Sequence, residues 1–564
     1  MNETKKIVGV VALVAVMGVA IYAAKGRQPG FERDPAGVLI SGGNPDQNRV
    51  MEDIVDLVVG SESKRYPGIK SKADVQPILD QVKRIVAQNS RYPMVKVAGG
   101  IVKLIELHEG ILWRLRHVVE GSDWVHASVL FRLRSTYYNN YLWGPHLTAI
   151  MDYMAEPTST PNREPWEKAS EAQNWILGNV VTELQSQVTE LDKIMKDAKP
   201  KDVEFDFLRR ILVGSAPERG LTLIDKEDNR IFIKPYLYTL KFLMERAMMG
   251  LIYVSAINLD DLPQVSTTIM ARTEINLARG KVRDIKSYLL NRNDDDRPPK
   301  GITPKLVFDA LASYPRFLTW RMDIPSAAGS PQGRDKTKDL LDWAYRLGRS
   351  SAENQLRGYV CGIKYHLHRS PNLSDAECMT KPSAPREFIP RGERFVYNPN
   401  LMVDDLDKKF NAFAQRVAVY SSPANAYATV TSDVTGQTLQ INVRKFFDVT
   451  LPPRAFIPTG FNNPGAASDT DVTSRFGREY KWNYLHGLPN QYSRWVTASN
   501  GTGRHTTVDY TLNGVFQQGS SFDGFLRNMT TLLYTDSVAP FAAFIRFPST
   551  VRMFIGVSDL VDAN

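Results

Sequence analysis

Apolar residues recur three and four positions apart over most of the chain between residues 71 and 420, the spacing of one face of an amphipathic helix. Ser71 or Asp74 can cap the first of these helices. A longer helix is predicted between Glu164 and Asp197, where leucines stand seven apart. The pattern therefore predicts a helical domain over 71–420, arranged as a bundle or as an array of helical hairpins.

Two segments inside this domain depart from the amphipathic pattern. Short alternating runs on either side of a polar turn predict a β-hairpin at 221–233. The apolar run that follows contains Lys241, Glu245 and Arg246. Charges near the centre of a membrane span cost roughly 2.5 to 3.5 kcal/mol each, so this run is predicted to be a buried central helix instead.

The composition changes at about residue 421. Beyond this point lysine occurs only at Lys445 and Lys481, and short alternating runs rich in Thr, Val and aromatic residues are separated by Gly, Asn and Ser clusters. This pattern is typical of strands and turns. It predicts a β-rich domain over 421–564, and with the helical domain an α+β multidomain fold.

The N-terminus carries one uncharged apolar segment of 18 residues, Ile7 to Ala24, behind two lysines. Its length is at the short end for a transmembrane helix and somewhat long for a signal peptide. Tyr22 and the cations after it resemble the flank of a helix at the membrane interface, so we favour a retained anchor over 1–26. In this interpretation the N-terminus lies in the cytoplasm. The alternative is a cleaved signal peptide and a secreted body. The Gly- and Pro-rich residues 27–70 are predicted to be a flexible tether with room for one helix.

Charge and motifs exclude several classes of function. The net charge of +9 arises from 70 basic and 61 acidic residues without long blocks of one sign, so no nucleic-acid partner is predicted. The motifs of hydrolases, zinc proteases, nucleotide-binding loops and c-type haem sites do not occur in the sequence. We therefore predict no cofactor, no metal and no catalytic residue, and the sequence leans away from an enzyme.

Cys361 and Cys378, the only cysteines, enclose a short polar stretch. In an oxidising compartment they are expected to close this loop as a disulfide. Two alternatives stay open at this point. The thiols can remain free, or they can share a metal with His366 and His368, although their spacing does not match a zinc motif.

Aromatic residues gather within the β-rich region, where alternating positions share one face of a strand. Such a face can stack against glycan rings, anchor a partner protein, or form an ordinary aromatic core layer. The residues concerned are Tyr480, Trp482, Tyr484, Tyr492 and Trp495.

Three functions are compatible with these features. The first is a membrane-anchored envelope protein that is held in the membrane through residues 7–24. Its body would lie in the periplasm or outside the cell and act as a structural or assembly component of a complex. The partners in that complex would be other proteins or further copies of the same chain. The second is a protein that binds or cleaves cell-wall or extracellular glycans through the aromatic stretch 480–495. The third, weaker, is a solute-binding component.

Overall fold

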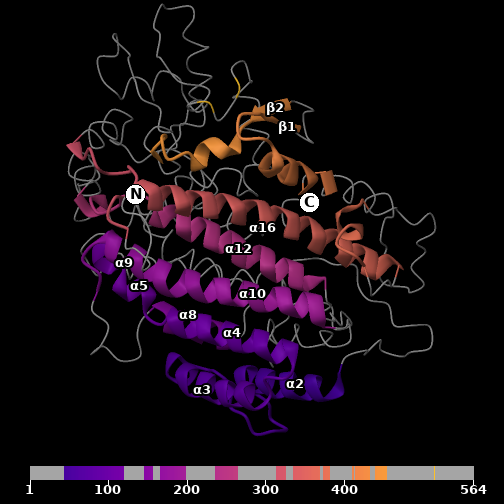
Figure 1. Cartoon of the computed structure of the whole chain (residues 1–564). Helices are drawn as coiled ribbons and strands as arrows, with labels where there is room; N and C mark the ends of the chain where they lie inside the picture. Colours follow the sequence, from indigo (N-terminus) through magenta and orange to yellow (C-terminus); the bar gives the residue numbers. More distant parts are fainter. Residues whose placement is uncertain are drawn as a thin grey trace, which may run out of the picture.

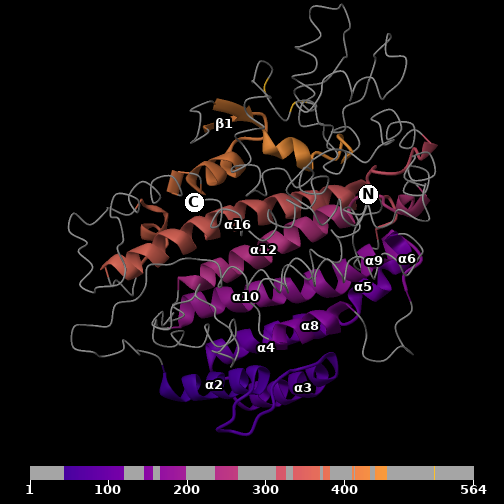
Figure 2. The same ribbon diagram turned by 180° about the vertical axis from the view of Figure 1, so that it is seen from behind.

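The computed structural model describes residues 44–119, 145–155, 165–198, 235–264, 313–324, 334–368, 373–381, 410–411, 413–431 and 438–453, together with residues 514 and 517. Most of these residues are helical, and the helices form a stack that largely follows chain order (Figure 1). From behind, the stack again runs from α2 and α3 at one end to β1 at the other (Figure 2). The described part of the chain is thus mostly helical, with one two-stranded sheet.

The first end of the stack is formed by α2 (Pro45–Val59), α3 (Lys72–Gln88), α4 (Pro93–Leu107) and α8 (Pro145–Ala155). Helix α3 begins as predicted, since the backbone N–H and the hydroxyl of Ser71 each donate a hydrogen bond of 2.8 Å to the Asp74 carboxylate. Its predicted apolar face points inward, with Ile78, Leu79 and Val82 buried. Two short helices, α5 (Ile111–Arg114) and α6 (Arg116–Val119), follow α4.

The long helix predicted before Asp197 is present. It begins at Ala169 and runs without a break through α9 (Ala169–Trp175), the π-helical turn η2 (Ile176–Val181) and α10 (Thr182–Asp197). Of its regularly spaced apolar residues, Leu184, Val188 and Leu191 are buried. The side of α10 that carries these residues packs against α4 and α12.

Two helices form the centre of the described structure, α12 (Tyr236–Ser255) and α16 (Arg334–His368). They share the most extensive contact among the described elements. They run antiparallel, because Thr239 packs beside Gly358 whereas Met249 packs beside Gly348. Nearly every described side chain of α12 is buried, which confirms the prediction of a buried central helix at this point of the chain.

The C-terminal end of α12 is closed by side chains from two other segments. The last carbonyl groups of a helix lack partners within the helix and need donors from elsewhere. Gln173 donates to the carbonyl groups of Val254 and Ile257 at 2.7 and 2.8 Å. Arg321, from the segment 313–324, is buried and donates to the Ser255 carbonyl at 3.1 Å.

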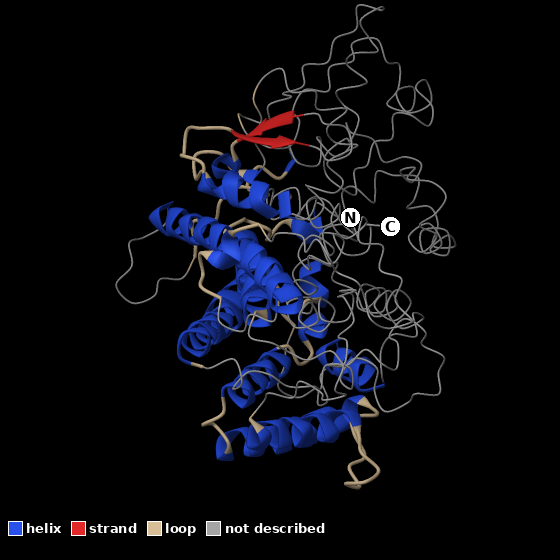
Figure 3. Ribbon diagram, turned by 90° about the vertical axis from the view of Figure 1, so that its right-hand side faces the viewer, coloured by secondary structure: helices blue, strands red, loops and turns tan. Residues whose placement is uncertain are grey.

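Beyond α16, a helix over 413–421 leads into an antiparallel hairpin of β1 (Ala428–Thr431) and β2 (Thr438–Ile441). In its register Ala428 faces Ile441 and Thr431 faces Thr438. Figure 3 shows the strands at one end of the helical stack. The 3₁₀ segment η6 (Val443–Phe447) follows and returns to the core, where the Tyr253 hydroxyl donates to the Phe446 carbonyl at 3.0 Å.

Part of the predicted tether belongs to the helical body. In α2, Val50, Met51 and Ile54 are buried in the same core cluster as residues of α3 and α4, so the later part of 27–70 is packed and does not form a flexible tether. The helix also has an N-cap, because the Asn44 side chain accepts from the backbone N–H groups of Asp46 and Gln47. Helix α2 is the one helix for which the prediction for 27–70 left room.

Several predictions lie outside the described residues. These are the apolar segment 7–24, the hairpin 221–233 and most of the β-rich region 421–564. Within the residues described, no helix combines the length and hydrophobicity needed to cross a membrane.

We predict that Gly348→Ala destabilises the protein, because a Cβ atom at this position comes within 2.6 Å of the buried Tyr420 ring. Overpacking of this kind costs about 1–3 kcal/mol. The free energy of unfolding, measured by urea denaturation, is expected to fall accordingly. Gly178→Ala is the matched control, because a Cβ there meets no atom within 4 Å. An equal loss of stability in both variants would contradict the steric explanation.

Candidate functional site

The most unusual polar chemistry in the described structure lies between α10, α12 and α16. Five side chains form a group, here called the Glu245 cluster. Asp192 comes from α10, Lys241 and Glu245 from α12, and Ser350 and Asn354 from α16. Residues that are four apart lie on the same side of a helix, which brings Lys241 and Glu245 together and Ser350 and Asn354 together.

Glu245 is at the centre of the cluster and is only 3% exposed. Its two carboxylate oxygens each accept one hydrogen bond of 2.8 Å, from the Ser350 hydroxyl and from the Asn354 side-chain amide. Burial raises the pKa of Glu245 from 4.5 to about 7, and the nearby Lys241 and the two hydrogen bonds offset this rise only in part. A large fraction of the Glu245 side chains therefore carries a proton at neutral pH.

Lys241 does not fully compensate the charge of Glu245. Its ammonium group lies 2.5 Å from an Asp192 carboxylate oxygen and 3.8 Å from Glu245 Oε1. The shorter contact is with the more exposed acid, since the Asp192 side chain is 50% exposed. The lysine is thus engaged mainly toward the surface, and Glu245 faces neutral donors on its other side.

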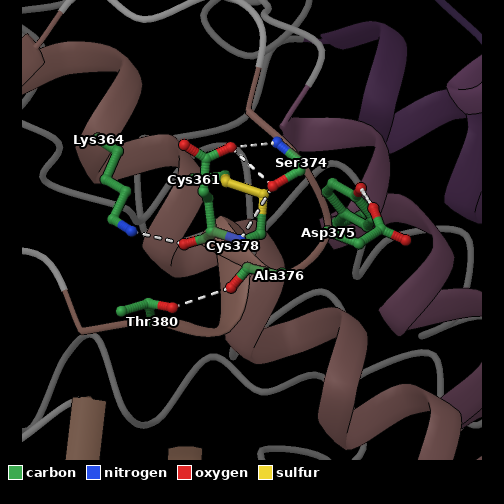
Figure 4. Close-up of a disulfide and its surroundings, with 9 residues drawn as sticks. Cys361, Lys364, Ser374, Asp375, Ala376, Cys378 and Thr380 are labelled. Atoms are coloured by element: carbon green, nitrogen blue, oxygen red, sulfur yellow. Dashed lines mark hydrogen bonds between the residues drawn. A yellow bond between two sulfur atoms is a disulfide. The ribbon is translucent and has the colours of Figure 1, made fainter.

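A second polar contact joins α12 to the segment 373–381. The Tyr238 hydroxyl donates a 2.5 Å hydrogen bond to Asp375, and burial, followed by this bond, raises the pKa of Tyr238 far above its ordinary value. The 3₁₀ turn η5 (Glu377–Met379) packs on α16 in the same segment. Figure 4 shows Asp375 beside the two cysteines.

Cys361 of α16 and Cys378 of η5 lie at disulfide distance and are joined in the structure, with their Cα atoms 4.9 Å apart (Figure 4). Both residues are buried. Two further bonds hold the turn, because Lys364 donates to the Glu377 carbonyl at 2.5 Å and the backbone N–H of Ser374 donates to the Glu377 carboxylate at 2.7 Å. The segment 373–381 is therefore fixed to α16 covalently and to α12 through Tyr238.

The other residues singled out in the sequence add no described contact to this region. The aromatic residues of 480–495 lie outside the described part of the chain. His366 and His368 belong to the last turn of α16. Among the residues described, no group of three or more His, Cys, Asp or Glu side chains is arranged to hold a metal ion.

Sequence reasoning did not select Glu245 as a site residue, although it noted the charge. The available signal was an acid inside an almost wholly apolar helix, because a buried carboxylate requires partners or a proton. Its partners could not be identified from the sequence, since Ser350 and Asn354 stand more than 100 positions later, at separations of 105 and 109.

We expect the double variant Cys361→Ser/Cys378→Ser to lose about 3 kcal/mol of unfolding free energy, the chain-entropy value for a loop with a sequence separation of 17. Urea denaturation without reductant measures the difference. With dithiothreitol present, the parent protein should unfold at the same urea concentration as the variant. Identical midpoints in the absence of reductant would show that the cysteines are not bonded in the folded protein.

No family model matches the chain. No curated protein and no solved structure matches it either. A function must therefore be inferred from the chain's own residues, foremost the N-terminal apolar segment, the cysteine pair and the buried Glu245 cluster.

Proposed function

We propose that the chain is a membrane-anchored envelope protein whose body lies outside the cytoplasm and acts as a structural or assembly component of a complex. The observation that carries this proposal is the cysteine pair Cys361 and Cys378, placed at disulfide distance within the helical body. Disulfides persist in oxidising compartments and are rare in the cytoplasm. The apolar segment Ile7 to Ala24 provides a means of export and of attachment.

The arrangement of the body supports an assembly role. The helices lie one beside another in a stack, so many of them present a side or an end to the surroundings (Figure 1). In repeat proteins, stacked helices provide extended surfaces for partner binding. The β-rich region 421–564, of which β1 and β2 are described, completes the proposed α+β architecture.

Export and attachment are tested in a bacterial host that expresses the full chain. The protein is expected in the membrane fraction after alkaline carbonate washing, and protease added outside spheroplasts should digest its body. Thiol labelling under denaturing, non-reducing conditions should leave both cysteines unmodified, whereas the single variant Cys361→Ser should expose Cys378 to the label. This result is expected because the two thiols are consumed in one bond.

A variant lacking residues 7–24 is the matched control. It should remain inside the cell, resist external protease and react with the thiol reagent. A full-length protein that is soluble, protected from protease and doubly labelled would contradict the proposal. Release of a shortened, oxidised body into the soluble fraction would instead identify the segment as a cleaved signal peptide.

The assembly role has its own test. Mild crosslinking in membranes, followed by purification and light scattering, should yield a species larger than the 63.5 kDa of one chain. A monomer without partners would count against a scaffold. Retention on insoluble peptidoglycan, lost in Trp482→Ala and Trp495→Ala, would support the glycan-binding alternative. A solute-binding protein should instead be a monomer whose thermal stability rises with a small ligand.

A further inference from the structure

The contacts of Glu245 with α16 can accommodate either protonation state of the carboxyl group, and it is burial that favours the neutral form. Its partners on α16 are both uncharged, a hydroxyl and an amide, each 2.8 Å away. When Glu245 carries a proton, its own hydroxyl can donate to Ser350 Oγ, because a serine hydroxyl can accept as well as donate. Asn354 continues to donate to the other oxygen, so both oxygens of the neutral acid keep a hydrogen-bond partner.

The charges around Glu245 come from three elements. On α12 itself, Lys241 lies 3.8 Å away, and Arg246 is the next residue. Asp192 of α10 holds Lys241 at 2.5 Å and adds a second negative charge nearby. On α16, Arg357 Nη1 lies 3.4 Å from Asn354 Oδ1 and the same guanidinium is paired with Glu353.

Among the residues that the structure describes, the remaining neighbours of α12 add no cation at hydrogen-bonding distance from Glu245. The π-turn η2, with the sequence ILGNVV, has no ionisable side chain. The one acid of α9, Glu171, accepts from the backbone N–H of Glu167 at 2.9 Å, at the helix N-terminus. On the helix over 413–421, Arg416 donates to Gln355. None of these groups stabilises an ionised Glu245 directly.

We infer that Glu245 is a proton-dependent joint between α12 and α16, which holds the two helices together when it is neutral and loosens their contact when it ionises. This device is separate from the proposed envelope function, because it depends only on the contacts of the two helices. It would make the packing of the body respond to the pH of its surroundings.

The direction of the effect follows from proton linkage. The pKa of Glu245 is about 7 in the folded chain, against 4.5 when the side chain is exposed. Between these two pH values, Glu245 keeps its proton while α12 and α16 are packed together and loses it when the two helices separate. The stabilisation is therefore fully present below pH 4.5, declines as pH rises, and is lost above about pH 7.

Hydrogen exchange with mass spectrometry on the full chain tests this inference. Between pH 5.5 and 8.5, after correction for intrinsic exchange rates, protection of peptides from α12 and α16 should fall on the order of tenfold. Peptides from α3 and α4 serve as an internal reference, because they lie at the other end of the stack (Figure 1). Their protection should change much less.

Glu245→Gln should remove this pH dependence. Glutamine can accept from Asn354 through its oxygen and donate to Ser350 through its amide, and it does not ionise. The matched control is Glu353→Gln, the same chemical change on α16, at an acid paired with Arg349 and Arg357. The control variant should keep the response of the parent.

Three outcomes would overturn the inference. These are a parent protein with no pH-dependent loss in α12 and α16, an equal loss in the reference peptides, or a Glu245→Gln variant that responds as the parent does. If Glu245→Gln does not fold, the comparison of α12 and α16 with the reference peptides in the parent still decides the question.

Discussion

Helix α12 is surrounded on nearly all sides, and the rest of the described structure depends on how its polar groups are accommodated. Among its described side chains only Tyr238 and Lys241 are partly exposed. A buried polar group without a partner costs about 1–3 kcal/mol. Three polar side chains of α12 therefore constrain the positions of neighbouring elements. Tyr238 binds the segment 373–381, Lys241 binds α10, and Glu245 binds α16.

The C-terminal end of α12 is subject to the same requirement. The carbonyl groups of Val254, Ser255 and Ile257 accept from Gln173 and Arg321, which belong to α9 and to the segment 313–324. Arg321 also donates to Asn174 at 2.8 Å, and its own carbonyl accepts from Thr337 of α16 at 2.7 Å. One buried arginine thus connects three elements that are far apart in the sequence. A positive charge near carbonyl groups at a helix C-terminus is also favourable electrostatically.

Local patterns predicted much of the helical part of this fold. The cap at Ser71, the inward face of α3 and the long helix before Asp197 all follow from residues close together in the sequence. The pairing of Glu245 with Ser350 and Asn354 depends instead on which side of α16 faces α12, and no local pattern contains that information. The cysteine loop lies between these cases. Its short spacing indicated a closed loop, but its attachment to α12 through Asp375 required the structure.

Two glycines explain why a carboxyl group in the middle of this interface responds to pH. At Gly358 an added Cβ would lie 2.7 Å from Thr239 Oγ1, and at Gly348 it would lie 2.6 Å from Tyr420 and 3.0 Å from Met249. Helices α12 and α16 are therefore in close contact at two points along their length, and the contact between Glu245 and Ser350 lies between these two points. Burial of Glu245 in this interface outweighs the favourable effect of Lys241, so the cost of the charge acts on the packing of the two helices.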